Sequence, residues 1–298
     1  MKKIYALAIL ATASLALTAQ AETKTGTLDI GDFEGCTTYI YGQNIERAPF
    51  NFYFTNSGTQ LIYTAEEIAP LVEAGAKITS LTFRFGDPEA MSYYDFSYNL
   101  HAYMQLIDAD RFTLIDGKTN WFTPGGDSAI GEGTFTFDMI MDMASEDIPA
   151  TVTFATPFEI PKTATGKSLL ITSWATLDTG DSEGGQCIYP YAENNAARTY
   201  RMACFASDTK DNFIEQVNTG ALIDLVTTGT DVYNTDIPVL RISYTYEDTA
   251  DGIECISTPE EDAPAQYFNL QGQRIYYHEP GQLVIKRQGS QAVKTIIR

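Results

Sequence analysis

Residues 95–106, DFSYNLHAYMQL, alternate between polar and apolar side chains along their whole length. The even-numbered positions are all apolar or aromatic: Phe96, Tyr98, Leu100, Ala102, Met104 and Leu106. The odd-numbered positions are mostly polar: Asp95, Ser97, Asn99, His101, Tyr103 and Gln105. Because successive side chains of a β-strand point to opposite faces of its sheet, this period of two predicts a strand with one face in a core.

The same alternation recurs at 81–85 and at 240–246, and Gly, Pro, Asn and Asp residues separate many short runs of this kind. Helical periodicity is scarce. The sequence Thr-Ala-Glu-Glu at 64–67 is a helix capping box, but Pro70 interrupts the helix that it would begin, so we expect two short turns ending at Gly75. Many short strands with little helix predict an all-β fold, a two-sheet β-sandwich.

The N-terminus predicts a signal peptide over residues 1–21. Lys2 and Lys3 precede an apolar run at 6–17, and Ala19-Gln20-Ala21 is a small-residue cleavage site. The alternatives are a membrane anchor or a buried helix, but the run is too short to span a bilayer and no second apolar segment follows. We therefore expect export, with no transmembrane segment.

Charge divides the rest of the chain into unlike parts. Residues 22–265 hold 12 basic and 38 acidic side chains, a net charge of −26, whereas residues 266–298 hold five basic and one acidic, a net charge of +4. The acidic part repels nucleic-acid phosphates and anionic lipids, so we expect no nucleic-acid partner.

Composition predicts matching domain boundaries. We expect the β-sandwich at 22–248 and an acidic, proline-containing linker at 249–265. A small β module follows at 266–298, where turns at Gly272, Pro280-Gly281 and Gly289 separate four short β-like runs.

The four cysteines, Cys36, Cys187, Cys204 and Cys255, form no C-x-x-C motif, which argues against a zinc or thioredoxin-like site. A hairpin over 186–205 would place Cys187 opposite Cys204, where a disulfide fits the geometry. The alternative is that both are small buried thiols. Cys36 and Cys255 would form the remaining pair.

Six segments, QLIYTAEEI, AKITSLTFRF, YNLHAYMQLIDADRF, ATVTFATPFEIP, KSLLITSWA and IPVLRISYTY, resemble in their order a jelly-roll module. Such modules occur in secreted and surface proteins of Bacteroidetes-type bacteria, including cleaved-adhesin modules, and the resemblance spans roughly residues 58–246. It implies a jelly-roll-like sandwich that acts as a non-enzymatic adhesin-like module and binds a glycan or a host or surface protein. The alternatives are a carbohydrate-active enzyme or its accessory module, and a structural surface or fimbrial subunit.

The sequence NLQGQ at 269–273 resembles a turn in the C-terminal β segment of exported proteins from the same bacterial group. The strand after it, at 281–285, lacks the usual aromatic residue, and the segment is shorter than a full type IX sorting domain. The resemblance implies the type IX secretion machinery as a partner and a location at the cell surface, on the outer membrane or outside the cell. The alternatives are a periplasmic location and a tail that caps the sandwich.

Catalytic motifs are absent from the sequence: its two histidines, His101 and His278, lie in no metal-binding or triad pattern. We therefore predict no catalytic residues and no enzyme, although pairs of acids in so acidic a chain leave a glycosidase open.

Two sets of side chains are candidates for binding. Most aromatic residues of the chain must belong to the core, but those in or near predicted loops could stack on sugar rings. These candidates are Tyr93, Tyr94, Trp121, Tyr189 and Tyr191. Asp178, Asp181 and Glu183 share a glycine-containing loop and offer the oxygen ligands that Ca²⁺ prefers. Structural Ca²⁺ is therefore the one cofactor that the sequence suggests. The alternative is an acidic loop that is simply solvated.

Overall fold

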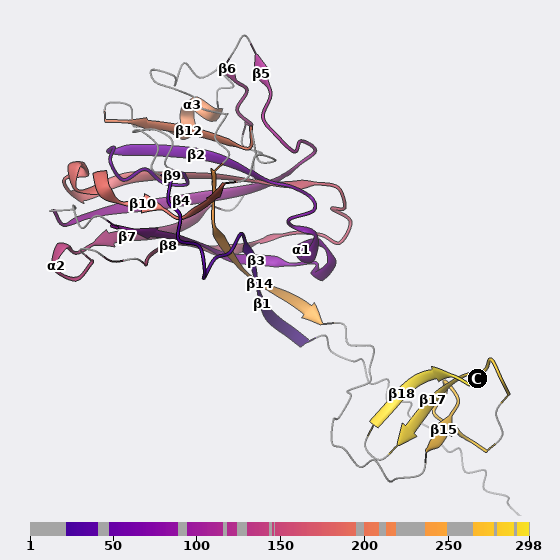
Figure 1. Cartoon of the computed structure of the whole chain (residues 1–298). Coiled ribbons are helices and arrows are strands. Elements are labelled where there is room, and N and C mark those ends of the chain that lie inside the picture. The colour runs from indigo at the N-terminus through magenta and orange to yellow at the C-terminus, as the bar shows by residue number, and fades with distance from the viewer. Residues whose placement is uncertain are drawn as a thin grey trace, which may run out of the picture. The chain divides into compact units, whose positions relative to one another are not determined.

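Residues 96–106 lie in strand β4 (Phe96–Ile107), near the middle of a large antiparallel sheet (Figure 1). The structure is a computed structural model that describes residues 22–40, 48–88, 94–115, 118–123, 130–142, 145, 147–194, 200–208, 213–218, 236–248, 265–276, 279–288 and 291–297. It divides into two compact units, one formed by Thr23–Glu247 and one that contains Asp248–Arg298. The predicted signal peptide, Cys255, His278 and linker residues 249–264 lie outside the described residues.

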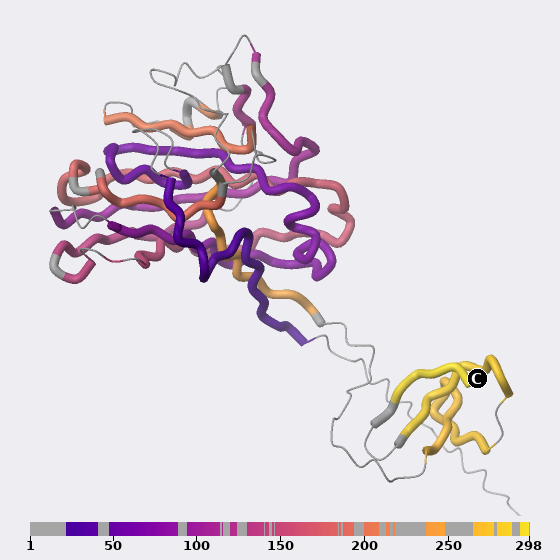
Figure 2. The backbone as a smooth tube through the Cα atoms, in the orientation of Figure 1, coloured from indigo at the N-terminus to yellow at the C-terminus, as the bar shows by residue number. Residues whose placement is uncertain are grey.

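The larger unit is built on one extended set of hydrogen-bonded strands. Nine of them follow in the order β1-β14-β3-β8-β7-β4-β9-β2-β12, and β10 also pairs with β3. Their bounds are β1 (Glu22–Ile30), β2 (Asn56–Tyr63), β3 (Lys77–Gly86), β7 (Gly131–Phe137), β8 (Ile148–Glu159), β9 (Ser168–Gly180), β10 (Tyr189–Pro190), β12 (Met202–Ser207) and β14 (Leu240–Asp248). Figure 2 shows the indigo segment of β1 beside the orange segment of β14, its neighbour in the sheet.

Shorter elements complete the described part of this unit. Two small sheets pair β5 (Leu114–Ile115) with β6 (Lys118–Thr119), and β11 (Ala192–Asn194) with β13 (Asp236–Pro238). The helical elements are α1 (Ala69–Ala74), α2 (Met139–Asp142), the 3₁₀ turn η1 (Ser182–Cys187) and α3 (Phe213–Asn218). Among the described residues, no helix has the length and apolarity to cross a membrane.

The strands form a sandwich because the hydrogen-bonded set is nearly interrupted between β7 and β8. The ladder there consists of the single pair Glu132–Thr153, whereas β4 and β9 pair along twelve positions. Side chains from the two halves meet in one core: the rings of Phe85 on β3 and Phe135 on β7 lie 5.8 Å apart. The predicted two-sheet β-sandwich is confirmed, with the two sheets joined at the β7–β8 edge.

Core packing follows the alternation of β4. Phe96, Tyr98, Leu100, Ala102 and Met104 are all buried in the central cluster. Phe52 lies among these rings, with its centroid 4.0 Å from that of Phe135 and 5.1 Å from that of Tyr98. The Tyr98 hydroxyl donates to the carbonyl oxygens of Phe52 and Phe54, at 2.6 and 2.9 Å, so its polar atom has partners inside the core.

Two glycines on β7 let the sheets approach each other. A Cβ atom on Gly133 would lie 2.0 Å from the carbonyl oxygen of Thr151 on β8, and one on Gly131 would lie 2.7 Å from side-chain atoms of Val152 and Phe154. The Thr151 carbonyl oxygen belongs to the backbone, so it cannot move aside by a side-chain rotation. The absence of a side chain at residue 133 is therefore a condition for the closed sandwich.

The expected short turns before Gly75 are present. The amide of Thr64 donates to the Glu67 carboxylate at 2.8 Å, as a capping box predicts. A turn over residues 65–68 comes first, and α1 begins only at Ala69, with a proline in its first turn. Gly75 ends α1 at φ +64°, the left-handed conformation that glycine adopts without strain.

The predicted hairpin over 186–205 is wrong. β10 pairs with β3, and β12 pairs with β2 over six positions, which places Cys204 opposite Thr59. β12 instead extends the main sheet by pairing with β2, a strand that is distant in the sequence. The local sequence at 186–205 did not indicate this partner. Cys187 and Cys204 are both buried and are not joined in a disulfide; Cys36 is also a buried thiol. The second predicted pair involves Cys255, outside the described residues.

The C-terminal unit is a four-stranded antiparallel sheet in the order β16-β15-β17-β18. Its strands are β15 (Gln266–Phe268), β16 (Arg274–Ile275), β17 (Leu283–Gln288) and β18 (Gln291–Ile296). The Asn269 side chain closes the first turn by accepting from the amides of Gln271 and Gln273, at 3.1 and 2.8 Å. The expected small β module is therefore present.

Replacing Gly133 with alanine should destabilise the sandwich by about 3 kcal/mol, because the new methyl group can be accommodated only by moving the β8 backbone. Thr134→Ala, at the neighbouring exposed position of the same strand, should change the free energy of unfolding by less than about 0.5 kcal/mol. Urea unfolding of both variants measures this difference. Equal stabilities would show that the β7–β8 contact is not tight.

Candidate functional site

The outward face of β4 and β9 carries a contiguous group of partly or fully exposed side chains. The strand register places His101 opposite Trp174, and Asn99 opposite Thr176. Asp178 follows on β9, where the register shifts. We call Asn99, His101, Trp174, Thr176 and Asp178 the outer-face patch. Asn99, Thr176 and Asp178 are exposed, and the two rings are partly buried.

The aromatic end of the patch is an imidazole stacked on an indole. The ring centroids of His101 and Trp174 lie 5.0 Å apart with an interplanar angle of 20°, and Tyr103 meets the indole edge-on at 6.4 Å. Burial lowers the pKa of His101 below its ordinary value, and the nearby Glu132 carboxylate opposes that shift. Burial therefore favours the uncharged form of the imidazole.

The polar end of the patch is organised around Asp178. Its carboxylate accepts from the Asn99 amide at 3.3 Å and from the Ser97 hydroxyl at 3.4 Å. Ser97 also shares a 2.8 Å hydrogen bond with Thr179. The first two bonds are long, so the carboxylate and the Asn99 amide retain hydrogen-bonding capacity toward a ligand.

A second hydrophobic cluster borders the patch on the β2–β12 side. Phe213 of α3 lies directly over Gly58, where a Cβ atom would come within 2.4 Å of the ring. Trp121 and Phe205 pack against Phe213, and Trp174 packs against the edge of this cluster. The cluster therefore supports the indole.

The five aromatic residues predicted from sequence do not form one site. Tyr94 is 51% exposed, Tyr189 is partly buried and Tyr93 lies outside the described residues. Trp121 and Tyr191 are only 9% and 4% exposed, so the expectation that they present open rings is wrong. Trp121 is buried because α3 covers it, a contact between segments far apart in the sequence.

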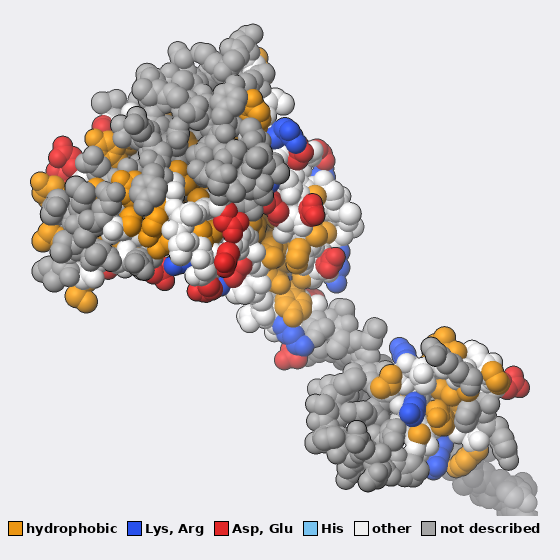
Figure 3. All heavy atoms as spheres, in the orientation of Figure 1, with side chains coloured by type: hydrophobic (Ala, Val, Ile, Leu, Met, Phe, Trp, Pro, Cys, Tyr) orange, Lys and Arg blue, Asp and Glu red, His pale blue; other side chains and the backbone are white. Residues whose placement is uncertain are grey.

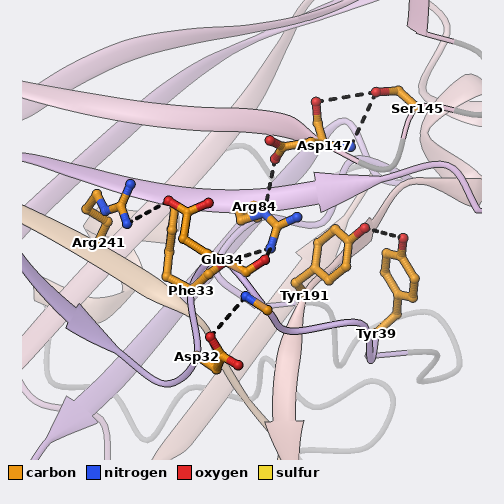
Figure 4. A network of polar contacts seen from close by, with 10 residues as sticks. Asp32, Phe33, Glu34, Tyr39, Arg84, Ser145, Asp147, Tyr191 and Arg241 are labelled. Atoms are coloured by element: carbon orange, nitrogen blue, oxygen red, sulfur yellow. Dashed lines mark hydrogen bonds and ion pairs between the residues drawn. The ribbon is translucent and has the colours of Figure 1, made fainter.

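Tyr191 is buried between two other side chains (Figure 4). The Arg84 guanidinium lies 4.3 Å above its ring, and the Tyr39 ring lies 4.2 Å from it, with a 2.6 Å hydrogen bond between the two hydroxyls. Arg84 also donates to the Phe33 carbonyl at 2.6 Å and to Asp147 at 3.1 Å. This arrangement holds the N-terminal loop against β3, and we assign it a structural role.

Two of the three acids predicted to bind calcium, Asp178 and Asp181, have local partners for their carboxylates. Asp178 contacts Asn99, and Asp181 accepts from the amide of Glu183 at 3.0 Å as the N-cap of η1. In the described part of the chain, no three His, Cys, Asp or Glu side chains are grouped closely enough to hold a metal ion. The structure thus gives the calcium prediction no support.

Sequence reasoning placed His101 on the outer face of its strand but missed Trp174. In SLLITSWATLDTG, Leu169, Ile171 and Ala175 lie on the opposite side of the strand from Trp174, but Leu170 and Thr172, on the same side as Trp174, are buried as well. A tryptophan in an apolar run is usually core, so only the register with β4 shows that its ring lies on the outer face.

Comparisons with known proteins add no assignment: no protein-family model matches the chain, and no curated protein resembles it significantly. The resemblance to surface jelly-roll modules therefore rests on the order of six sequence segments.

Asp181→Ala should lower the free energy of unfolding by about 1 kcal/mol, the usual cost of losing an N-cap. Asp181→Asn keeps an oxygen acceptor and should cost less. We expect equal thermal midpoints in millimolar Ca²⁺ and in EDTA for the wild type. A higher midpoint in Ca²⁺ that Asp181→Asn abolishes would instead establish the calcium site.

Proposed function

We propose that this protein is a non-enzymatic surface protein whose sandwich binds a carbohydrate through the outer-face patch. The observation that carries the proposal is the stacked His101–Trp174 pair beside exposed amide, hydroxyl and carboxylate groups. A pyranose ring presents apolar C–H groups, which pack against aromatic rings, and hydroxyl groups that donate and accept hydrogen bonds. The patch offers both kinds of partner on the outward face of two neighbouring strands.

Several features make the patch suitable for recognition. Trp174 packs against the second hydrophobic cluster and against His101, so little side-chain entropy is lost when a ligand binds. Asn99 and Asp178 lie on facing strands and are already in contact, so their polar groups are positioned in advance. A rigid aromatic group beside a few oriented polar groups is the usual composition of a specific small-ligand site.

Trp174→Ala should weaken carbohydrate binding at least tenfold, which corresponds to about 1.4 kcal/mol. Trp174→Phe, which keeps an aromatic ring, should weaken it less. Tyr276→Ala removes a more exposed ring, 74% accessible, from the C-terminal unit and is the matched control. Glycan-array and calorimetric titrations measure the effect, and thermal melts verify that each variant is folded.

Two other results would decide against this proposal. Release of products from a polysaccharide panel would make the protein a carbohydrate-active enzyme. Equal carbohydrate binding by the wild type and Trp174→Ala would show that the carbohydrate binds elsewhere on this protein. Binding to a host or surface protein but to no carbohydrate would favour a protein ligand.

We further propose that the C-terminal unit contacts the export or attachment machinery at the cell surface, with the type IX system as the candidate. The register places Leu283 opposite Ile296 on one face of the sheet, and they are 46% and 59% exposed. Ile285, two residues after Leu283, is on the same face, and it pairs with Lys294 and with Phe268. Phe268 in turn pairs with Arg274, so both basic residues lie on this face. Figure 3 shows blue basic side chains on this unit and red acidic ones at several places on the larger unit.

Deleting residues 266–298 should reduce the amount of protein exposed at the cell surface several-fold. The double change Leu283→Ser and Ile296→Ser should have the same effect if the exposed apolar face makes the contact. Val293→Ser, at a 51% exposed position on the opposite face, is the control. Cell fractionation with surface protease treatment measures the distribution. Unchanged exposure of the truncated chain would show that the tail only caps or stabilises the protein.

A further inference from the structure

We infer that the outer-face patch is selective for uncharged sugars over sugars that carry carboxylate or sulfate groups. This inference rests on the proposed carbohydrate-binding function and specifies the ligand class for the same site. It follows from the charges on the strands that form this surface.

The five strands on this side of the sandwich contain no basic residue. The sequences of β7, β4, β9, β2 and β12, which are neighbours in that order, include neither Lys nor Arg. The other sheet differs, because Arg84 and Lys77 lie on β3 and Arg241 lies on β14. Proteins that recognise carboxylate or sulfate groups usually supply a guanidinium or ammonium partner, and these five strands supply none.

Acidic side chains occur on both sides of the aromatic pair. Glu132 on β7 is exposed and pairs in register with His101 on β4. Asp178 on β9 is exposed and contacts Asn99. A sugar bound at His101 and Trp174 would therefore lie beside the Glu132 carboxylate, and one that extends along β9 would also reach Asp178, so an anionic group on it would meet like charge.

The expected selectivity is modest but measurable. Two like unit charges at close range repel each other, and the repulsion is stronger near a protein surface of lower effective dielectric than in bulk water. At physiological ionic strength such interactions are screened beyond roughly 8 Å. We therefore expect an anionic group to weaken binding about tenfold or more, and added salt to reduce the difference.

The remaining groups of the patch fit a hydroxyl-rich neutral ligand. The carboxylate of Asp178 accepts hydrogen bonds, the Asn99 amide both donates and accepts, and the Thr176 hydroxyl does the same. Burial disfavours the charged form of His101, which reduces any positive charge that could offset Glu132 and Asp178. Sugar hydroxyl groups satisfy all of these partners without placing a like charge beside them.

The test uses the full chain and immobilised oligosaccharides in matched pairs, each a neutral glycan and its sialylated or sulfated derivative. The measured quantity is the ratio of the two dissociation constants, which a general loss of affinity does not change. At 50 mM salt the neutral member of each bound pair should bind about tenfold more tightly or better. The ratio should fall toward one at 500 mM salt.

Two variants identify the source of the discrimination. Glu132→Gln, and the double variant Glu132→Gln with Asp178→Asn, remove charge while keeping the shape, and the ratio should fall stepwise. Glu159→Gln, an exposed acid on β8 in the other sheet that pairs with Lys77, should leave the ratio unchanged.

The outcomes separate the two proposals. If no glycan of either kind binds, the proposed function fails, and the charge selectivity fails with it. If glycans bind and the anionic members bind as well as or better than their neutral partners, the binding function stands and the selectivity is overturned. A ratio that persists unchanged in the double variant also overturns the assignment to Glu132 and Asp178.

Discussion

The close approach of β7 and β8 is the constraint on which the rest of the structure depends. The two strands share one ladder pair, Glu132–Thr153, and only a glycine at position 133 leaves room for the Thr151 carbonyl. At this edge one hydrogen-bonded set of strands becomes two facing layers. The aromatic rings of Phe52, Phe85 and Phe135 can then pack together, which removes a large apolar surface from water.

The same closure decides which side chains stay outside the core. Once the even-numbered side chains of β4 are committed to the core, His101 and Asn99 must point outward, and the register aligns them with Trp174 and Thr176. Part of that outer surface is covered by the cluster around Phe213, and the remainder is the outer-face patch. The candidate binding site is thus the exposed reverse side of a strand whose other side is core.

Aromatic residues serve several distinct purposes in this chain. Those of the core fill volume, whereas Tyr191 and Phe33 lie under the guanidinium groups of Arg84 and Arg241, each 4.3 Å from the ring centre. Arg241 is also paired with Asp29 and Glu34, at 2.7 and 2.8 Å. These two arginines connect the N-terminal segment to β3 and β14, so their positive charges are used for internal contacts.

The sequence by itself determined the fold class, the strand at 95–106 and the small C-terminal sheet, because alternation and turn residues act over a few neighbouring positions. It also placed His101 on an outer face. Tertiary structure alone decided which strands are neighbours, that β12 pairs with β2 and not with β10, and that Tyr191 and Trp121 are covered. It alone brought Trp174 beside His101, because pairing and burial depend on contacts between residues far apart in the chain, which no local pattern encodes.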